Sequence, residues 1–344
     1  MEFKIIKFDF QNAAPEVWDG YFRHADEMQC ELHPEDPLLP WEKRKAMMIS
    51  GEANPYSRAC RFLAFPEDST GVAAGFVSAV AETPLSPSYE TNRQTGDLSL
   101  YVSPGCRSQG LGSLLLKRVI EELAARETSV TELLAHVNLD CGRRFIERRG
   151  GTLSIKFAEN WLYFKEVDWP MVEAWAAEGE RKNPGMAIKT VTAIPLDDIE
   201  EYCVVYAETM NQQPMGDLAV RAKCTPEQIR FGEKKNLEQG VTRTTIYSKE
   251  GDGHISGLTE IVYFKEAGHR VKQLLTGVRE QYRGRGLGKL LKARMLLHVR
   301  KEYPEVKYVL TANADSNGAM LAINNKLGFK TDLPTKVYKL KIQG

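Results

Sequence analysis

Short apolar stretches and one-sided helical patterns alternate along the chain, and the same succession occurs twice. Residues 98–102 and 274–278 are apolar stretches that predict buried strands. A glycine-containing turn follows each stretch. Leucines spaced three and four residues apart come next, which predicts a helix with one buried face from Leu111 and from Leu287. The pattern therefore predicts a duplicated strand–turn–helix unit.

The rest of the pattern extends this duplication to both halves of the chain. Each half is expected to contain a strand, two helices, three strands, the turn with its helix, a strand, a helix and a last strand. In the first half these elements are expected at 3–8, 17–31, 41–49, 61–65, 75–80, 98–102, 111–126, 132–137, 141–149 and 161–167. In the second half they are expected at 187–191, 197–210, 225–235, 244–248, 255–264, 272–278, 287–303, 308–311, 317–327 and 336–342.

The two turns share the sequence Arg-x-x-Gly-x-Gly, which begins at Arg107 and, 176 positions later (283 − 107 = 176), at Arg283. Glycines let the backbone turn tightly and approach a ligand closely. The first N–H groups of the following helix and its dipole favour an anion such as a pyrophosphate. Neither turn has the Gly-Lys-Ser/Thr of a P-loop or the Gly-x-Gly-x-x-Gly of a dinucleotide fold.

The repeated Arg-x-x-Gly-x-Gly resembles the signature of the GNAT acyltransferase superfamily, and the element order of both halves resembles the GNAT order. The resemblance implies an α/β (α+β) protein with two tandem GNAT domains. Each would have a mixed, mostly antiparallel central sheet flanked by helices, with splayed fourth and fifth strands. It also implies acetyl-CoA as cofactor, with its pantetheine arm between the splayed strands.

The resemblance assigns cofactor-binding residues in both halves. In the first half they are Val102, Arg107, Ser108, Gln109, Gly110, Leu111, Gly112 and Ser113. In the second half they are Thr276, Gly277, Val278, Arg283, Gly284, Arg285, Gly286, Leu287, Gly288, Lys289, Asn313, Asn317 and Asn324. Asn317 has an alternative interpretation as a helix N-cap, and Asn313 as a turn residue.

The second half carries more of the superfamily's detail, because its segment ends in Leu-Gly-Phe at Phe329. We therefore expect residues 1–168 to be a degenerate or structural GNAT domain, 169–186 a helical linker and 187–344 the catalytic domain. This asymmetry is similar to that of mycothiol synthases, which are tandem members of the superfamily. Many GNAT enzymes have a tyrosine four residues before the final glycine, where this chain has Ile146 and Asn324. The general acid is therefore open among Tyr263, Tyr282 and Tyr308.

The implied reaction is direct attack of an amine on the acetyl carbonyl, for which the ammonium must first lose a proton. Glu260, in the expected strand 255–264, is the candidate base, and a solvated strand carboxylate is the alternative interpretation. Asp315, His269 and ordered water are weaker candidates.

Composition limits the classes of partner. Lys+Arg and Asp+Glu number 46 each, which gives no support for nucleic-acid binding. No apolar stretch is long enough to span a membrane, and the start of the chain lacks a secretory pattern. The six cysteines form no Cys-x-x-Cys pair, and no cluster has metal-ligand spacing, so we expect reduced thiols, no metal and a cytoplasmic location.

We therefore expect transfer of an acetyl group from acetyl-CoA to a primary amine of a small molecule. Amine-bearing antibiotics are one substrate class within this interpretation. The alternatives are acetylation of a protein lysine or N-terminus, and a non-catalytic acyl-CoA-binding regulator. A monomer is expected, with its two halves forming a pseudo-dimer.

Overall fold

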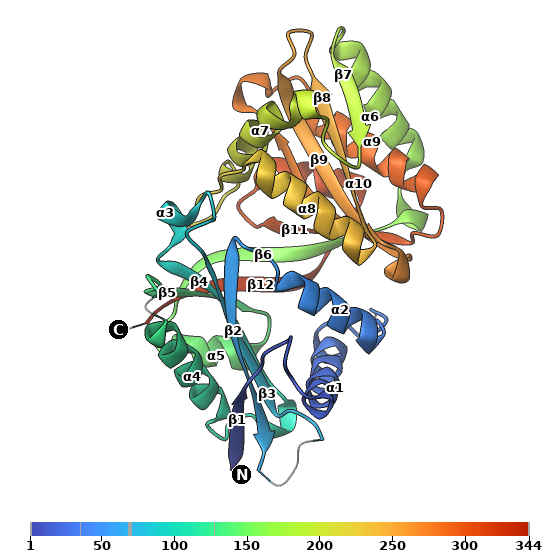
Figure 1. Ribbon diagram of the computed structural model, residues 1–344. Helices are drawn as coiled ribbons and strands as arrows, with labels where there is room; N and C mark the ends of the chain where they lie inside the picture. Colours follow the sequence, from blue (N-terminus) through green and yellow to red (C-terminus); the bar gives the residue numbers. More distant parts are fainter. Residues whose placement is uncertain (1, 35, 68–70, 127, 343–344) are drawn as a thin grey trace. The chain divides into compact units, whose positions relative to one another are not determined.

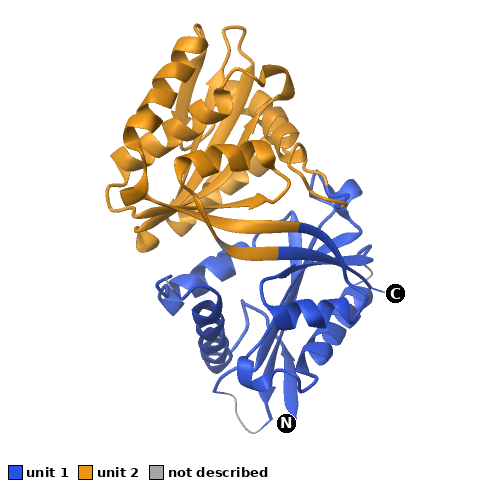
Figure 2. Ribbon diagram, turned by 180° about the vertical axis from the view of Figure 1, so that it is seen from behind, with its two compact units in different colours: residues 1–155, 218–220, 336–344 blue, residues 156–217, 221–335 orange. Residues whose placement is uncertain are grey.

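The computed structural model describes residues 2–34, 36–67, 71–126 and 128–342. The chain forms two compact units (Figure 2). Unit 1 comprises residues 1–155, 218–220 and 336–344, and unit 2 comprises residues 156–217 and 221–335. Among the described residues, no helix is long and apolar enough to cross a membrane.

Unit 1 contains a six-stranded sheet in the order β1-β2-β3-β4-β5-β12, in which only the β4–β5 pair is parallel. Its strands are β1 (Phe3–Lys7), β2 (Ser57–Pro66), β3 (Gly75–Glu82), β4 (Thr95–Val102), β5 (Glu132–Val137) and part of β12 (Lys330–Lys341). Its helices are α1 (Pro15–Leu32), α2 (Trp41–Gly51), the short α3 (Tyr89–Asn92), α4 (Leu111–Ala125) and α5 (Asp140–Glu147).

Successive side chains of β2 point to opposite faces of this sheet, as the strand geometry requires. Leu63 packs with Trp18 and Phe22 of α1, whereas Phe62 packs with Leu115 of α4. Helices α1 and α2 thus cover one face of the sheet, and α4 and α5 cover the other (Figure 1).

Unit 2 repeats this plan with the order β6-β11-β10-β9-β8-β7, in which only β10–β11 is parallel. Its strands are part of β6 (Thr152–Tyr163), β7 (Ala187–Val191), β8 (Val241–Lys249), β9 (Ile255–Phe264), β10 (Arg270–Val278) and β11 (Tyr308–Ala314). Its helices are α6 (Trp169–Lys182), α7 (Ile199–Asn211), α8 (Pro226–Gln239), α9 (Leu287–Glu302) and α10 (Gly318–Leu327).

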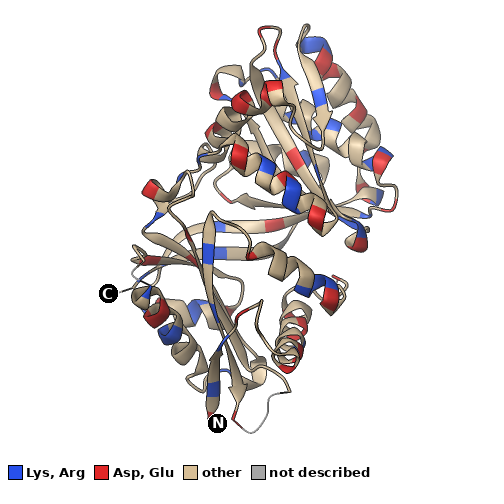
Figure 3. Ribbon diagram, viewed as in Figure 1, with Lys and Arg blue, Asp and Glu red and all other residues tan. Residues whose placement is uncertain are grey.

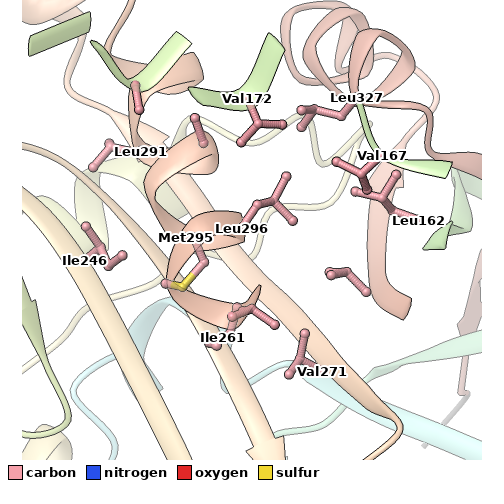
Figure 4. Close-up of a cluster of buried hydrophobic side chains, with 14 of the residues drawn as sticks. Leu162, Val167, Val172, Ile246, Ile261, Val271, Leu291, Met295, Leu296 and Leu327 are labelled. Atoms are coloured by element: carbon pink, nitrogen blue, oxygen red, sulfur yellow. The ribbon is translucent and has the colours of Figure 1, made fainter. Parts of the chain in front are cut away.

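Helices α7 and α8 cover one face of the unit 2 sheet, and α6, α9 and α10 cover the other (Figure 1). Figure 4 shows part of the second core, where Val172 of α6 packs with Leu291 and Leu296 of α9 and with Leu327 of α10. A Cβ on Gly179 of α6 would lie 2.7 Å from the Cβ of Leu290. The segment expected as a linker therefore contains a helix that is packed tightly into unit 2.

The final strands of the two halves are exchanged between the units. From Phe157 to Tyr163, β6 pairs with β11 of unit 2, and from Lys336 to Lys341, β12 pairs with β5 of unit 1. Each sheet is completed by the terminal strand of the other half of the chain. The compact units therefore do not follow the expected limits at 168 and 187. Strand β6 also begins at Thr152, nine residues before its expected start at Trp161 (161 − 152 = 9).

The fourth and fifth strands of each unit separate after a short paired stretch, which confirms the expected fold class. Strands β10 and β11 pair only from Arg270 to Lys272, although β10 continues to Val278. Strands β4 and β5 pair only from Thr95 to Leu98. The unpaired edges leave backbone groups available between the separated strands.

We predict that an isolated 1–168 fragment does not fold as a stable monomer, because β5 would lack its partner β12 and expose a strand edge. The check is a two-dimensional amide NMR spectrum of the fragment with and without a peptide of residues 330–342. The peptide should convert a collapsed or aggregated spectrum into a dispersed one.

A matched control joins residues 330–342 to residue 155 through a flexible linker, and this chain should fold alone. A dispersed spectrum from the unassisted 1–168 fragment, with β6 paired to β5, would show that the exchange is dispensable.

Candidate functional site

The glycine turn of unit 2 forms an open cradle of backbone donors. Gly284 and Gly286 have φ angles of 79° and 80°, and a Cβ built on either would meet no atom within 4 Å. Gly286 is the N-cap of α9, and its carbonyl accepts the first helical bond from the N–H of Leu290. The N–H groups of residues 287–289 therefore lack helical partners and are placed to hold an anion.

The turn of unit 1 has almost the same backbone shape. Gly110 has a φ of 83° and caps α4, and Ser108 has a φ of 63° where unit 2 has Gly284 (108 + 176 = 284). One difference is that the N–H of Ser113 donates to the carbonyl of Gly110. The first turn of α4 therefore presents one fewer free donor than that of α9.

The arginines that begin the two motifs have different partners. Arg107 donates to both carboxylate oxygens of Glu31, at 2.8 and 2.5 Å, and this pairing lowers the pKa of Glu31. Arg283 instead donates to the neutral amide of Gln212 at 2.7 Å. The charge of the first arginine is thus neutralised, whereas the charge of the second has no acidic partner among the contacts of the described residues.

Arg285, expected to bind the cofactor, is held away from the cradle. It donates to Glu250 at 3.0 Å and to Asn183 at 2.8 Å. Lys289, also expected to bind the cofactor, has a local contact as well, because its ammonium lies 5.3 Å from the ring centre of Trp175. These two contacts would have to give way before either side chain could reach a phosphate.

Strand β10 is irregular where it leaves β11. Its register with β9 shifts between Gln273 and Thr276, which marks a β-bulge. A Cβ on Gly277 would lie 2.4 Å from the Cβ of Thr209 in α7, so only glycine fits there. The paired register of β3 and β4 in unit 1 has no such shift, and Tyr101 stands where unit 2 has Gly277 (101 + 176 = 277). Unit 2 therefore opens more backbone between its separated strands.

The structure brings together two of the three expected asparagines. The amide nitrogen of Asn324 donates to the side-chain oxygen of Asn313 at 2.6 Å, which joins α10 to β11. Asn324 is 1% exposed, and its own oxygen has no partner among the described protein atoms. Asn317 is the N-cap of α10, where its side chain accepts from the N–H of Met320 at 3.3 Å.

Glu260, the expected base, is fully buried and surrounded by donors. Its carboxylate accepts from Arg243 at 3.1 and 2.7 Å, from Tyr202 at 2.6 Å and from Thr245 at 3.2 Å. It is therefore not the solvated strand carboxylate of the alternative interpretation. To accept a proton, it would have to exchange one of these bonds, so the role of base stays a prediction.

Sequence reasoning missed the residues around Glu260. Arg243 and Thr245 are two positions apart on β8, so their side chains lie on the same face of the sheet, under α7. Nothing in this spacing shows that they face Glu260. Gly75 of β3 and Gly257 of β9 are equivalent, because each pairs with the last residue of the strand that follows. Counting three residues onward from each glycine places Ser78 of unit 1 at the position of Glu260. Unit 1 thus lacks a carboxylate there.

Coenzyme A, the cofactor that the resemblance implies, fits the residues of unit 2. Gly284 and Gly286, both at positive φ, leave the cradle uncrowded, because a Cβ built on either would meet no atom within 4 Å. The bulged, unpaired edge of β10 supplies backbone donors and acceptors for amides. Backbone groups for the amides of coenzyme A, on β10, are thus followed along the chain by backbone N–H groups for its phosphates, at the start of α9.

Comparisons with known proteins agree with this geometry. Residues 21–150 match the family model "Acetyltransferase (GNAT) family". A solved structure of a tandem GNAT protein from the clavulanic acid biosynthesis pathway is 21% identical, with a TM-score of 0.70 and coverage of 100% of this chain and 99% of that one. A GCN5-related N-acetyltransferase from Sphaerobacter thermophilus is 16% identical, with a TM-score of 0.64 and coverage of 99% and 96%. No curated protein matches the chain by sequence.

The whole chain has the tandem GNAT fold. Residues 21–150 match the model of the GNAT family. The family match supports acyl transfer as the general activity.

We predict that Arg243→Gln strongly destabilises unit 2, because it leaves the Glu260 carboxylate buried without its ionic partner. A broken buried pair costs roughly 3–5 kcal/mol. The double variant Arg243→Gln/Glu260→Gln should recover much of that loss, since neither charge is then buried alone. Urea denaturation of the four proteins measures the cycle, and additive effects of the two single variants would contradict the pairing.

Proposed function

We propose that the chain is an N-acetyltransferase that transfers the acetyl group of acetyl-CoA to a primary amine of a small molecule. The observation that carries this proposal is the continuity, in unit 2, of the bulged edge of β10 with the open glycine cradle before α9. In this arrangement the strand would contact the amides of an acyl-CoA and the helix terminus would contact its pyrophosphate.

Different residues of unit 2 would bind different parts of acetyl-CoA. The N–H groups of residues 287–289, assisted by Arg283, would hold the pyrophosphate. The edge of β10 from Thr276 to Val278 would orient the amides and the acyl carbonyl. When bound, acetyl-CoA supplies the activated acyl group. The attacking amine must arrive neutral, so a proton must leave it toward a carboxylate or water.

Unit 2 is the proposed catalytic half. It has the bulge, a motif arginine that donates to the neutral amide of Gln212, and the Asn313–Asn324 pair, whereas Arg107 of unit 1 is paired with the carboxylate of Glu31. The family model, however, matches residues 21–150, which supports the proposal that unit 1 also binds acyl-CoA in its own turn.

A small amine is the proposed acceptor, and amine-bearing antibiotics or their precursors are one class to test. The tandem GNAT protein from the clavulanic acid pathway is similar over the whole chain, which supports including such compounds in a panel. A non-catalytic acyl-CoA-binding protein is the second candidate, because Asn324 and Ile146 stand where many GNAT enzymes have a tyrosine. Release of free thiol from acetyl-CoA with amines, lysine peptides and N-terminal peptides separates these functions.

We predict that Gly286→Glu weakens CoA binding and turnover at least about tenfold, since charge-assisted hydrogen bonds contribute roughly 1.5–3 kcal/mol each. Gly110→Glu is a matched control, because both glycines have φ near 80° and open space, so both variants pay the same strain. Isothermal titration with CoA and the thiol-release assay measure the effects. Loss of turnover in Gly110→Glu with normal turnover in Gly286→Glu would assign catalysis to unit 1.

We predict that Glu260→Gln lowers turnover by about 10²–10⁴-fold if the carboxylate accepts the amine proton. The loss should shrink as pH rises, because more of the amine is then already neutral. CoA affinity should stay within about twofold, since Glu260 lies on β9 and not in the cradle. A variant that loses stability but keeps the wild-type turnover and pH profile would show that Glu260 is only the partner of Arg243.

A further inference from the structure

A cavity of about 480 Å³ lies in unit 2, lined by residues of α6, β7, β8 and the second half of α9. Small-molecule sites in proteins have volumes of roughly 300–1,000 Å³, so this cavity can hold one small ligand. Its first residue on α9 is Arg294, seven positions after Leu287 (294 − 287 = 7), which is roughly 10 Å along the helix axis. The cavity is therefore separate from the glycine cradle at the start of α9.

The inner part of the cavity is apolar, and its rim is open to solvent. Ile188 of β7, Ile246 of β8 and Leu297 of α9 line it, and they are part of the main core cluster of unit 2 or pack against it. At the rim, the side chains of Glu180 and Arg294 keep 40% and 39% of their surfaces exposed. A ligand with an apolar body can therefore enter from solvent and bury that body against the sheet and α9.

The side of the cavity formed by α9 carries basic groups. Arg294, His298 and Lys301 are spaced four and three residues apart, which puts them on one face of the helix. Arg294 forms an ion pair with Glu180, but its Nε, which can only donate, is buried and has no partner among the described protein atoms. The Nε2 of His298 is likewise buried and has no partner among these atoms. An acceptor on a ligand would supply the partner that both nitrogens lack.

The equivalent helix of unit 1 has a different character. The counterparts of Leu297 and His298 in α4 are Glu121 and Glu122 (297 − 176 = 121 and 298 − 176 = 122). The carboxylate of Glu122 accepts from Lys7 of β1 at 2.8 Å, so in unit 1 an ion pair joins the helix to the edge strand. The apolar and basic wall is thus a property of unit 2 and does not follow from the shared fold.

We propose that the cavity binds a small monocarboxylate with an apolar body, such as an aliphatic or aromatic acid. Its carboxylate accepts hydrogen bonds from Arg294 and His298, and its apolar part lies against Ile188, Ile246 and Leu297. The guanidinium of Arg294 supplies the balancing charge, which strengthens its hydrogen bond to the ligand. A neutral apolar molecule would leave the two nitrogens unpaired.

The charges around the cavity favour a monoanion. Burial lowers the pKa of His298, so its ring is neutral at pH 7 and offers a hydrogen bond but no charge. Lys301 is paired with Glu302 at 3.0 Å, and Glu180 brings a negative charge to the rim. A monocarboxylate can pair with Arg294 in this setting, whereas Glu180 would repel a phosphate dianion more strongly. Binding at this cavity does not depend on the proposed acetyltransferase function, because none of its residues belongs to the acyl-CoA site.

Titration of the full-length protein, labelled with ¹³C in the isoleucine δ1 methyl groups, tests this site with hexanoate and benzoate as probes. The methyl signals of Ile188 and Ile246 should shift until the site is saturated. Ile323 reports on the cradle, because its δ1 carbon would lie 3.4 Å from a Cβ on Gly288, and its signal should not move. Hexanamide has a similar apolar body without the charge and should bind at least about tenfold more weakly. Inorganic phosphate should leave Ile188 and Ile246 unshifted.

Arg294→Gln should weaken hexanoate binding about tenfold or more, because it removes the charged donor. Arg300→Gln is the matched control, since Arg300 also pairs with a glutamate of α6, Glu173 at 2.7 Å, but does not line the cavity. It should bind hexanoate as the wild type does. His298→Leu, which removes the second polar contact, should weaken binding several-fold and makes the test independent of a single substitution.

The proposal is overturned if neither acid shifts Ile188 and Ile246 at millimolar concentration, or if hexanamide binds as well as hexanoate. Wild-type affinity in both Arg294→Gln and His298→Leu would overturn it as well. Shifts of Ile323 alone would put the anion in the cradle, and stronger shifts of Ile188 with phosphate would exclude the monocarboxylate. Titration of the same sample with CoA, followed at Ile323, keeps a failure here distinct from a failure of the proposed function.

Discussion

The site depends on the separation of one parallel pair of strands in each unit. Backbone N–H and C=O groups that leave a sheet ladder must find other partners, or their burial is costly. In unit 2 two contacts lie beside the separated strands: Thr209 of α7 packs against Gly277 of β10, and Asn324 of α10 bonds to Asn313 of β11. The pairing of β10 with β11 ends at Lys272, so the edge of β10 beyond this residue can pair with a ligand.

The two halves have nearly the same backbone at the glycine turn, but the arginines of the two turns have partners of different charge. Both turns have two residues at positive φ before the helix, which are glycines except for Ser108. The two helices begin at the equivalent residues Leu111 and Leu287. The differences lie in side chains from distant helices: Glu31 of α1 neutralises Arg107, whereas Gln212 leaves Arg283 charged. Lys, Arg, Asp and Glu are otherwise interspersed over both units (Figure 3). The contrast between the turns is therefore local and does not reflect a general difference in charge.

The sequence predicted the parts of this structure that depend on neighbouring residues. The glycine turns, the helices behind them and the cap at Thr225 are set by local backbone preferences, and each is present. The exchange of β6 and β12 was not predictable from pattern, because either strand has the alternation needed to pair with β5 or β11. The bonds of Arg107 to Glu31, 76 positions away, and of Arg285 to Asn183, 102 positions away, are likewise set by the fold. Glu260 illustrates the same limit, since its alternating strand is typical of half-exposed carboxylates, yet Arg243 and Tyr202 bury it.

The exchanged strands have a consequence for synthesis of the chain on the ribosome. Strand β5 ends at Val137, but its partner in β12 begins to pair only at Lys336. At elongation rates of about 5–20 residues per second, these positions emerge roughly 10–40 s apart. During that interval the nascent first half carries an open strand edge, which is the feature that chaperones protect and that promotes association between chains. A protein built this way completes its N-terminal unit only after its second half has been translated, so the two halves are tied together in time as well as in sequence.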